Sequence, residues 1–201
     1  MAPRDGRCKV NMKDISLIGF MGCGKSSVGK ILATLLPECR LIDLDTYIEE
    51  KQGKNIPEIF NEYGEAAFRR MEREALEEIF SDKSRPRAIL SLGGGTVTSE
   101  QCRQLIRQHT DCFYLRATTD TLLDNLEGHS DGRPMLNPTQ PVEAQSTETS
   151  SEREALRHRI ESLMQTRSPQ YIATAHHIID IDGLSFAQIA EAVEDNILNI
   201  K

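Results

Sequence analysis

The sequence contains no tryptophan, and aromatic side chains make up only 5% of its 201 residues. No apolar run approaches the roughly 20 residues that a membrane-spanning helix requires. The first residues, MAPRDGRCKVNMKD, lack the apolar centre of a secretory signal peptide. These absences argue against membrane insertion and secretion, so we predict a cytoplasmic protein with no membrane partner.

Cysteine pairs with the spacing of a metal or redox site are also absent. No two of the five cysteines form a CxxC pair, and an odd number cannot all be joined in disulfides. These residues are Cys8, Cys23, Cys39, Cys102 and Cys112. We therefore expect neither a disulfide framework nor a zinc site, and we expect most of the thiols to be reduced and packed. Cys23 lies near a predicted helix N-terminus, which favours the thiolate, so its reactivity stays open.

An excess of positive charge is missing as well. The chain has 24 Lys and Arg residues against 31 Asp and Glu residues, which gives a net charge of −7. Because no overall positive field would attract nucleic acid, we expect no nucleic-acid partner. Any anionic substrate must then be bound by a local group of basic side chains.

The composition and pattern that are present are typical of a globular α/β protein. Hydrophobic residues make up 38% and charged residues 27% of the chain, and the length favours one domain. Short apolar segments alternate with amphipathic ones, which predicts a parallel sheet covered by helices on both faces. We expect strands at about residues 15–18, 41–45, 88–91, 112–115 and 178–181. We expect helices at about residues 28–36, 46–52, 65–80, 99–109, 119–126, 152–173 and 185–201, and a short helix that opens at Asn55.

The segment GFMGCGKS, from Gly19 to Ser26, matches GxxxxGKS and lies between an apolar run and an amphipathic run. In this strand-to-helix context the motif binds nucleoside triphosphates, because backbone N–H groups and a helix N-terminus surround the phosphates. Lys25 would contact the β- and γ-phosphates, and the Ser26 hydroxyl would hold Mg²⁺. An ordinary glycine-rich turn is the alternative. The predicted nucleotide site consists of Gly22, Cys23, Gly24, Lys25, Ser26 and Ser27.

Two acids close the second predicted strand. Asp43 and Asp45 are two residues apart, so on an extended chain their side chains point the same way. At the carboxyl end of a parallel strand they would face the nucleotide. One could hold Mg²⁺ through water while the other accepts a proton from an acceptor hydroxyl. The alternative is that they only cap the next helix.

Arg69 and Glu72 lie three residues apart on a predicted helix, beside Phe68. The acid could hold the guanidinium rigid for a substrate carboxylate, because Arg binds planar anions through two hydrogen bonds. From spacing alone, a solvated ion pair on the helix surface is favoured.

Further anion contacts are open to interpretation. The glycines at 93–95 directly follow a predicted strand and either let the backbone approach a ligand or form a flexible turn. Arg133 and Arg167 are candidates for anion contact, although each alone is more often a surface charge. Arg133 lies in a segment, about 127–151, that is rich in Gly, Ser, Thr, Pro and Gln, which predicts a mobile lid.

Taken together, these segments resemble the shikimate kinases. The resemblance covers nearly the whole chain from about Asp14, and the ordered set of motifs is specific. It implies ATP-dependent phosphorylation of the 3-hydroxyl of shikimate, a step of chorismate and aromatic amino-acid synthesis. It also implies an α/β P-loop fold of the nucleoside-monophosphate-kinase type, with three layers, a five-stranded parallel sheet and a mobile lid. The motifs are GFMGCGKSSVGK at 19–30, LIDLDTYIE at 41–49, FRRME at 68–72, SLGGGTV at 91–97, RPML at 133–136 and RSPQY at 167–171.

The resemblance assigns roles on the nucleotide side of the site. Lys25 and Ser26 would bind the phosphates and Mg²⁺, and Asp43 would belong to the water shell of the metal. Asp45 would bind the shikimate hydroxyls and act on the one that attacks. Arg133 would close with the lid and stabilise the transferring phosphoryl group.

The resemblance also assigns the acceptor side. Arg69 and Arg167 would bind the shikimate carboxylate, and Glu72 would hold Arg69. Gly94 and Gly95 would line the pocket through their backbone. These basic groups would supply the local positive charge that an acidic protein needs for two anionic substrates.

The chain departs from the family at three places. Family members often carry an arginine before the lid and another after the last strand, where this chain has LLDNLE at 122–127 and GLSF at 183–186. The stretch 137–151 lengthens the lid. We expect a monomer with an extension at 1–13 and a kinase domain at 14–201. Two alternatives are a related kinase for another hydroxylated acid such as gluconate, and a regulatory module that binds nucleotide without catalysis.

Overall fold

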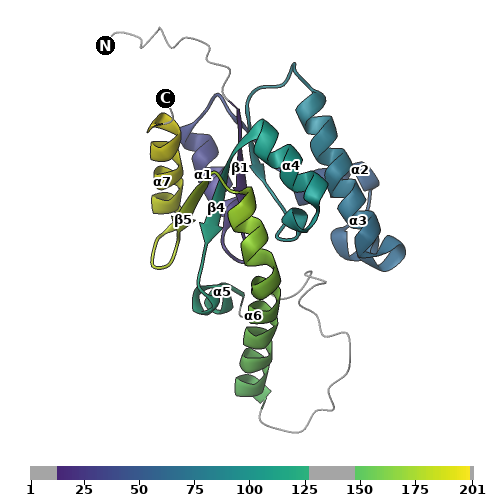
Figure 1. Cartoon of the computed structure of the whole chain (residues 1–201), viewed down its shortest axis with the longest axis vertical. Coiled ribbons are helices and arrows are strands. Elements are labelled where there is room, and N and C mark those ends of the chain that lie inside the picture. The colour runs from purple at the N-terminus through teal and green to yellow at the C-terminus, as the bar shows by residue number, and fades with distance from the viewer. Residues whose placement is uncertain (1–12, 127–147, 200–201) are drawn as a thin grey trace.

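A five-stranded sheet forms the centre of the computed structural model, which describes residues 13–126 and 148–199 (Figure 1). All neighbouring strands are parallel, and their order is β2-β3-β1-β4-β5. The parallel sheet predicted from the alternating pattern is therefore confirmed. The strands are β1 (Asp14–Ile18), β2 (Arg40–Asp43), β3 (Ala88–Ser91), β4 (Thr110–Arg116) and β5 (His177–Asp180).

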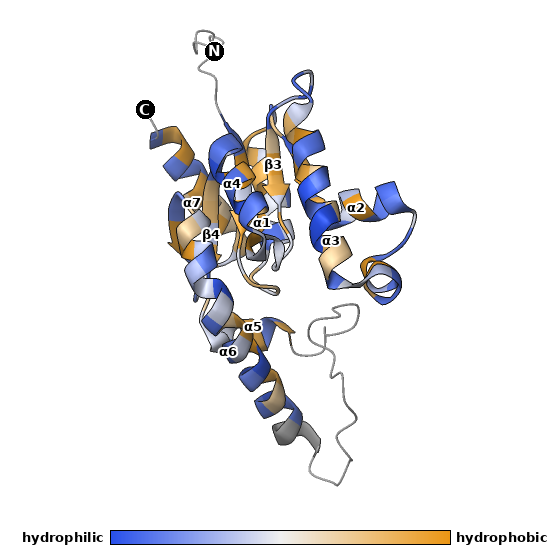
Figure 2. Cartoon of the chain, turned by 45° about the vertical axis from the view of Figure 1, so that its right-hand side comes forward, coloured by the Kyte–Doolittle hydropathy of each residue, from blue (hydrophilic) through white to orange (hydrophobic). Residues whose placement is uncertain are grey.

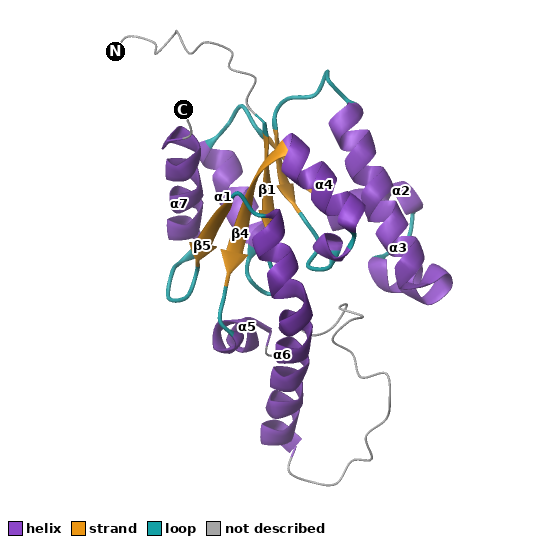
Figure 3. Cartoon of the chain, in the orientation of Figure 1, coloured by secondary structure: helices purple, strands orange, loops and turns teal. Residues whose placement is uncertain are grey.

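Helices cover both faces of this sheet. Helices α1 and α7 lie on one face and α3 and α4 on the other, so the three-layer fold is confirmed (Figure 3). The helices are α1 (Lys25–Leu35), α2 (Leu44–Gln52), α3 (Ile56–Ser81), α4 (Glu100–His109), α5 (Thr119–Leu126), α6 (Glu148–Thr174) and α7 (Phe186–Asn199), with a 3-10 turn, η1, at Thr96–Thr98.

The strands are apolar on both sides because both faces of the sheet are covered. In β1, Ile15 and Leu17 belong to the core against α1 and α7, whereas Ile18 belongs to the core against α3 and α4. The buried Ser16 hydroxyl is hydrogen-bonded to Thr110 Oγ1 at 2.7 Å. Figure 2 shows the hydrophobic strands enclosed by helices whose outer faces are hydrophilic.

The end of β2 differs from its prediction. The strand ends at Asp43 instead of Asp45, and Leu44 begins α2. Asp43 caps this helix, since its Oδ1 accepts a hydrogen bond from the Thr46 N–H at 3.4 Å. The prediction that Asp43 and Asp45 project together from an extended chain is therefore wrong, because Asp45 lies in the first turn of a helix.

Helix α3 consists of two helical segments that meet at Gly64. This residue has a φ of 76° and a ψ of 170°, which interrupts the helix. The first segment opens with a reciprocal capping box between Asn55 and Glu58. The short helix predicted to open at Asn55 and the longer one after Gly64 are both present.

The predicted lid and the N-terminal extension fall largely outside the described residues. This applies to residues 1–12, to 127–147 and therefore to Arg133. Helix α6 begins at Glu148, so the last residues assigned to the lid are helical backbone. Within residues 13–126 and 148–199, no helix combines the length and the apolar composition that a membrane crossing requires.

Candidate active site

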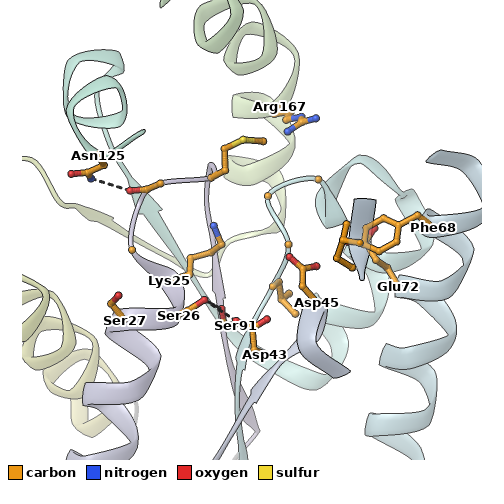
Figure 4. Close-up of a pocket in the computed structure, with 18 of the residues that line it drawn as sticks. Lys25, Ser26, Ser27, Asp43, Asp45, Phe68, Glu72, Ser91, Asn125 and Arg167 are labelled. Atoms are coloured by element: carbon orange, nitrogen blue, oxygen red, sulfur yellow. Dashed lines mark hydrogen bonds between the residues drawn. The ribbon is translucent and has the colours of Figure 1, made fainter. Parts of the chain in front are cut away.

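A cavity of about 630 Å³ lies at the carboxyl ends of β1, β2 and β3. This is where ligands bind in open parallel sheets. Its lining includes residues from the phosphate-loop motif, from the start of α2 and from the glycine run 93–95. Figure 4 shows Lys25 on the α1 side and Asp45 on the α2 side, with Arg167 approaching from α6. The fold thus brings together predicted site residues that are far apart in the sequence.

The phosphate loop is shaped by glycines and filled by its own lysine. Gly22 and Gly24 have φ values of 84° and 85°, a left-handed conformation that favours glycine. Lys25 is buried, with 8% of the residue exposed. Its Nζ donates hydrogen bonds to the carbonyl oxygens of Gly19 at 2.8 Å and Phe20 at 2.9 Å. The loop therefore holds the ammonium group close to the predicted phosphate position.

The thiol of Cys23 points into the protein. The residue is fully buried, and its Sγ lies 3.7 Å from Lys25 Nζ. Burial protects this thiol from reagents, so the structure opposes the reactive interpretation of Cys23. Cys39, Cys102 and Cys112 are also buried and free, which confirms the expectation of reduced and packed thiols for the described cysteines.

Two hydroxyls and a carboxylate meet at the ends of β2 and β3. Ser26 Oγ donates to Asp43 Oδ2 at 2.7 Å and lies 3.2 Å from Ser91 Oγ. Asp43 therefore caps α2 with one oxygen and faces the phosphate loop with the other. Sequence reasoning missed Ser91, although its place at the end of a buried strand before a glycine run was a usable signal. Among the described residues, no three His, Cys, Asp or Glu side chains are grouped as metal ligands.

Asp45 is an acid of the cavity whose pKa is strongly raised. Burial, and after it the negative charges of Glu72 and Asp43, raise its pKa to about 7. Lys25 and Arg69 oppose this shift. The carboxyl group therefore changes its charge close to neutral pH, as a general base requires.

The raised pKa of Asp45 predicts a pH-dependent stability. The folded chain holds this proton up to about pH 7, whereas the unfolded chain loses it near pH 3.8. Between these values the folded state binds more protons, so the free energy of unfolding falls as the pH rises. An Asp45→Asn variant should be more stable than the parent at about pH 8 by roughly 1–2 kcal/mol and similar at about pH 4. Urea denaturation at both pH values measures this, and an equal difference at both would contradict it.

Arg69 is partly buried and forms an ion pair with the fully buried Glu72. Arg69 Nη1 donates to Glu72 Oε2 at 2.6 Å, and the Glu72 side chain is fully buried. Thr96 donates its hydroxyl hydrogen to the other oxygen of Glu72. The surface ion pair favoured by spacing alone is therefore wrong, because this side of α3 faces the loop after β3. A Cβ at Gly95 would lie 2.2 Å from Arg69 Nη2, so a side chain at this position would displace the guanidinium from its present place.

Arg167 is also buried, with only 3% of the residue exposed. Its guanidinium lies 5.9 Å from the centre of the Phe20 ring. Its Nη1 has no hydrogen-bond partner in the described part of the chain. The surface charge that the sequence favoured for Arg167 alone is wrong, because α6 carries it into the cavity. One turn further along, Tyr171 donates its hydroxyl hydrogen to the carbonyl oxygen of Gly94 at 2.5 Å.

Sequence reasoning also missed the apolar wall of the cavity. Ile56 and Phe60 from the first segment of α3 and Phe68 from the second line it. The rings of Phe60 and Phe68 are 4.8 Å apart. In the sequence, the only indication of this wall was the spacing of the aromatic residues, which is equally typical of a hydrophobic core.

A second cavity of about 400 Å³ adjoins the phosphate loop. Asn125 and Phe186 line both cavities. Asn125 Nδ2 donates to the carbonyl oxygen of Gly22 at 2.9 Å. The ring of Phe186 occupies the space next to Gly24, where a Cβ would lie 2.5 Å from it.

Comparison with known proteins identifies the family. A family model described as shikimate kinase matches residues 21–198. The chain belongs to the shikimate kinase family. The curated shikimate kinase of Thermus thermophilus is 34% identical over 183 residues, which are 91% of this chain and 89% of that protein. The shikimate kinase of Chlorobaculum tepidum is 40% identical over 158 residues, 79% of this chain and 76% of that protein.

Solved structures of the family share the fold. The Acinetobacter baumannii shikimate kinase in complex with shikimate has a TM-score of 0.77 and 30% identity, covering 94% of this chain and 96% of that chain. The Bacteroides thetaiotaomicron shikimate kinase has a TM-score of 0.78 and 28% identity, covering 93% and 99%. The resemblance seen in the motifs and the predicted fold class are thereby confirmed, and the chain is a kinase of this family. The roles of individual residues stay predictions.

Proposed function

We propose that this kinase transfers the γ-phosphoryl group of ATP to the 3-hydroxyl of shikimate, giving shikimate 3-phosphate and ADP. The reaction would serve chorismate and aromatic amino-acid synthesis in the cytoplasm. The observation that carries the proposal is one cavity that joins a phosphate loop, a carboxylate with a pKa near neutrality, the buried guanidinium of Arg167 and the partly buried one of Arg69. Because one chain supplies both halves of the site, we propose that it acts as a monomer.

Arg69 and Arg167 would bind the acceptor carboxylate. A buried guanidinium with an unpartnered N–H group is costly unless an anion completes it, and Arg167 Nη1 is such a group. Arg69 is held by buried Glu72, which fixes its direction. The apolar wall of Phe60 and Phe68 would exclude water from the ring of the acceptor.

Asp45 would accept the proton of the attacking hydroxyl and orient it for in-line attack on the γ-phosphorus. Lys25 would exchange its hydrogen bonds to the loop carbonyls for the phosphates, since its Nζ is already in the loop. Arg133, which lies outside the described residues, would complete the positive charge around the phosphoryl group. The backbone of Gly94 and Gly95 would line the acceptor.

Ser26 and Asp43 fit a hard divalent cation such as Mg²⁺. Their oxygens meet at 2.7 Å, and Mg²⁺ prefers few protein oxygens together with water and phosphate. When bound, the cation would neutralise charge on the phosphates. Asp43 would act through water, as the family resemblance implies.

The second cavity would hold the nucleotide base. Phe186 is 42% exposed and offers an aromatic face next to the phosphate loop. Replacing Phe186 with alanine should weaken ATP binding about tenfold, because base stacking contributes roughly 1–3 kcal/mol. Calorimetry with ATP reports on the base site and the phosphate loop together, whereas inorganic triphosphate reports on the phosphate loop alone. The Kd for triphosphate should therefore be the same in Phe186→Ala and in the parent. Equal weakening for both ligands would contradict the base site.

The proposed function is tested by coupling ADP release to a visible reaction with shikimate, Mg²⁺ and ATP. Phosphorylation of shikimate at a much higher kcat/KM than gluconate or quinate would support it. A preference for gluconate would favour a related kinase. ATP binding without transfer to any of these acids would favour the regulatory module, although the acceptor residues Asp45, Arg69 and Arg167 in the first cavity argue against that alternative.

A further inference from the structure

Glu65 contacts the proposed carboxylate-binding arginine from the solvent side. It is the first residue after the interruption of α3 at Gly64. Arg69 Nη2 donates to Glu65 Oε1 at 3.0 Å, and Arg69 Nε donates to the same oxygen at 3.3 Å. The Glu65 side chain is 46% exposed, whereas Glu72 on the other side of the guanidinium is fully buried. Glu65 has no place in the mechanism described above.

The guanidinium of Arg69 already donates through Nε, Nη1 and Nη2 to two glutamates. A carboxylate binds Arg through two parallel hydrogen bonds, either at the Nε and Nη2 edge or at the two Nη atoms. Glu65 occupies the first edge. On the other side of the guanidinium, Nη1 donates to Glu72 at 2.6 Å. A carboxylate that takes the Nε and Nη2 edge must therefore replace Glu65.

The two glutamates differ in how firmly they are held. Glu72 is buried and also accepts a hydrogen bond from Thr96, so its release would leave an uncompensated buried charge. Glu65 is exposed, so breaking its ion pair and returning its carboxylate to water requires little free energy. Glu65 is thus the partner that can leave.

We propose that Glu65 holds the place of the acceptor carboxylate on Arg69 and is displaced when the acceptor binds. This inference rests on the proposed function. The exchange keeps Arg69 neutralised with and without acceptor. It also favours acidic acceptors, because an uncharged polyol has no group that can replace the glutamate.

The test is a Glu65→Gln variant of the full chain. Removing the competing charge should lower the Kd and the KM for shikimate about two- to fivefold, the range for an exposed ion pair. The kcat and the KM for ATP should stay unchanged. Glu62→Gln is the matched control, because Glu62 is 49% exposed on the same helix and pairs with Lys54 instead of Arg69.

A second ligand separates displacement from a general loosening of the site. The methyl ester of shikimate carries no charge to compete with Glu65, so its Kd should be the same in the parent and in Glu65→Gln. A shikimate Kd that is unchanged or higher in Glu65→Gln would overturn the inference, and so would equal tightening for acid and ester. If the parent chain binds no shikimate at all, the proposed function itself fails and the inference with it.

Discussion

Replacing Asp45 with asparagine is expected to lower kcat by about 10²- to 10⁴-fold, with the Kd for ATP changed by less than about twofold. The amide keeps the size of the side chain but cannot accept the proton of the attacking hydroxyl. Steady-state kinetics and calorimetry with ATP measure the two quantities. Asp195→Asn on α7 is a suitable control, because Asp195 is exposed and is not among the residues that line the cavity. A turnover equal to the parent's would remove Asp45 from the mechanism.

The same carboxylate should set the pH profile of the reaction. Because burial and the neighbouring acids raise its pKa to about 7, the ionised base becomes scarce below that value. We expect kcat/KM for shikimate to fall about tenfold per pH unit below pH 7 and to level off above it. The profile of the residual activity of Asp45→Asn should lack this step, and a step that persists there would belong to another group.

Replacing Arg167 with methionine should raise the Kd for shikimate about 10- to 100-fold, because a hydrogen-bonded charge pair contributes roughly 1.5–3 kcal/mol. Methionine fills part of the space but offers no donor to a carboxylate. Calorimetry with shikimate measures the loss. Arg157→Met is the matched control, since Arg157 lies on the same helix and pairs with Asp120 near the surface.

Arg167 is a cleaner test of carboxylate binding than Arg69. Removal of Arg69 would leave Glu72 buried without its partner, which destabilises proteins by roughly 3–5 kcal/mol and confuses binding with folding. Removal of Arg167 takes away a buried group that lacks one partner, so the melting temperature of the ligand-free protein should hold or rise. If Arg167→Met binds shikimate weakly and also has a lower melting temperature than the parent, the role of Arg167 is structural.

The sequence predicted the features that depend on local patterns. The parallel sheet follows from short apolar segments between amphipathic ones, and the phosphate loop follows from glycines and a Lys-Ser pair between a strand and a helix. The alternating pattern and the phosphate-loop motif both depend only on residues that are close together in the sequence. The ordered set of motifs then indicated the family, which the comparisons confirm.

The features that spacing alone predicted wrongly depend on packing between distant segments. Spacing shows that Arg69 and Glu72 share a helix face, but it does not say that this face meets the loop after β3. The burial of Arg167 depends in the same way on where α6 lies. Asp45 was misplaced for a local reason, because Asp43 caps α2 and ends the strand early.

The unpartnered nitrogen of Arg167 has a consequence for the survival of the protein in a cell. A fold that carries a buried cation without its full set of partners opens more often, and open chains are the form that proteases degrade. A metabolite that completes this cation would shift the population toward the closed form in proportion to its abundance. The protein should therefore be degraded more slowly when the acidic metabolite that binds Arg167 is abundant, and faster when that metabolite is scarce.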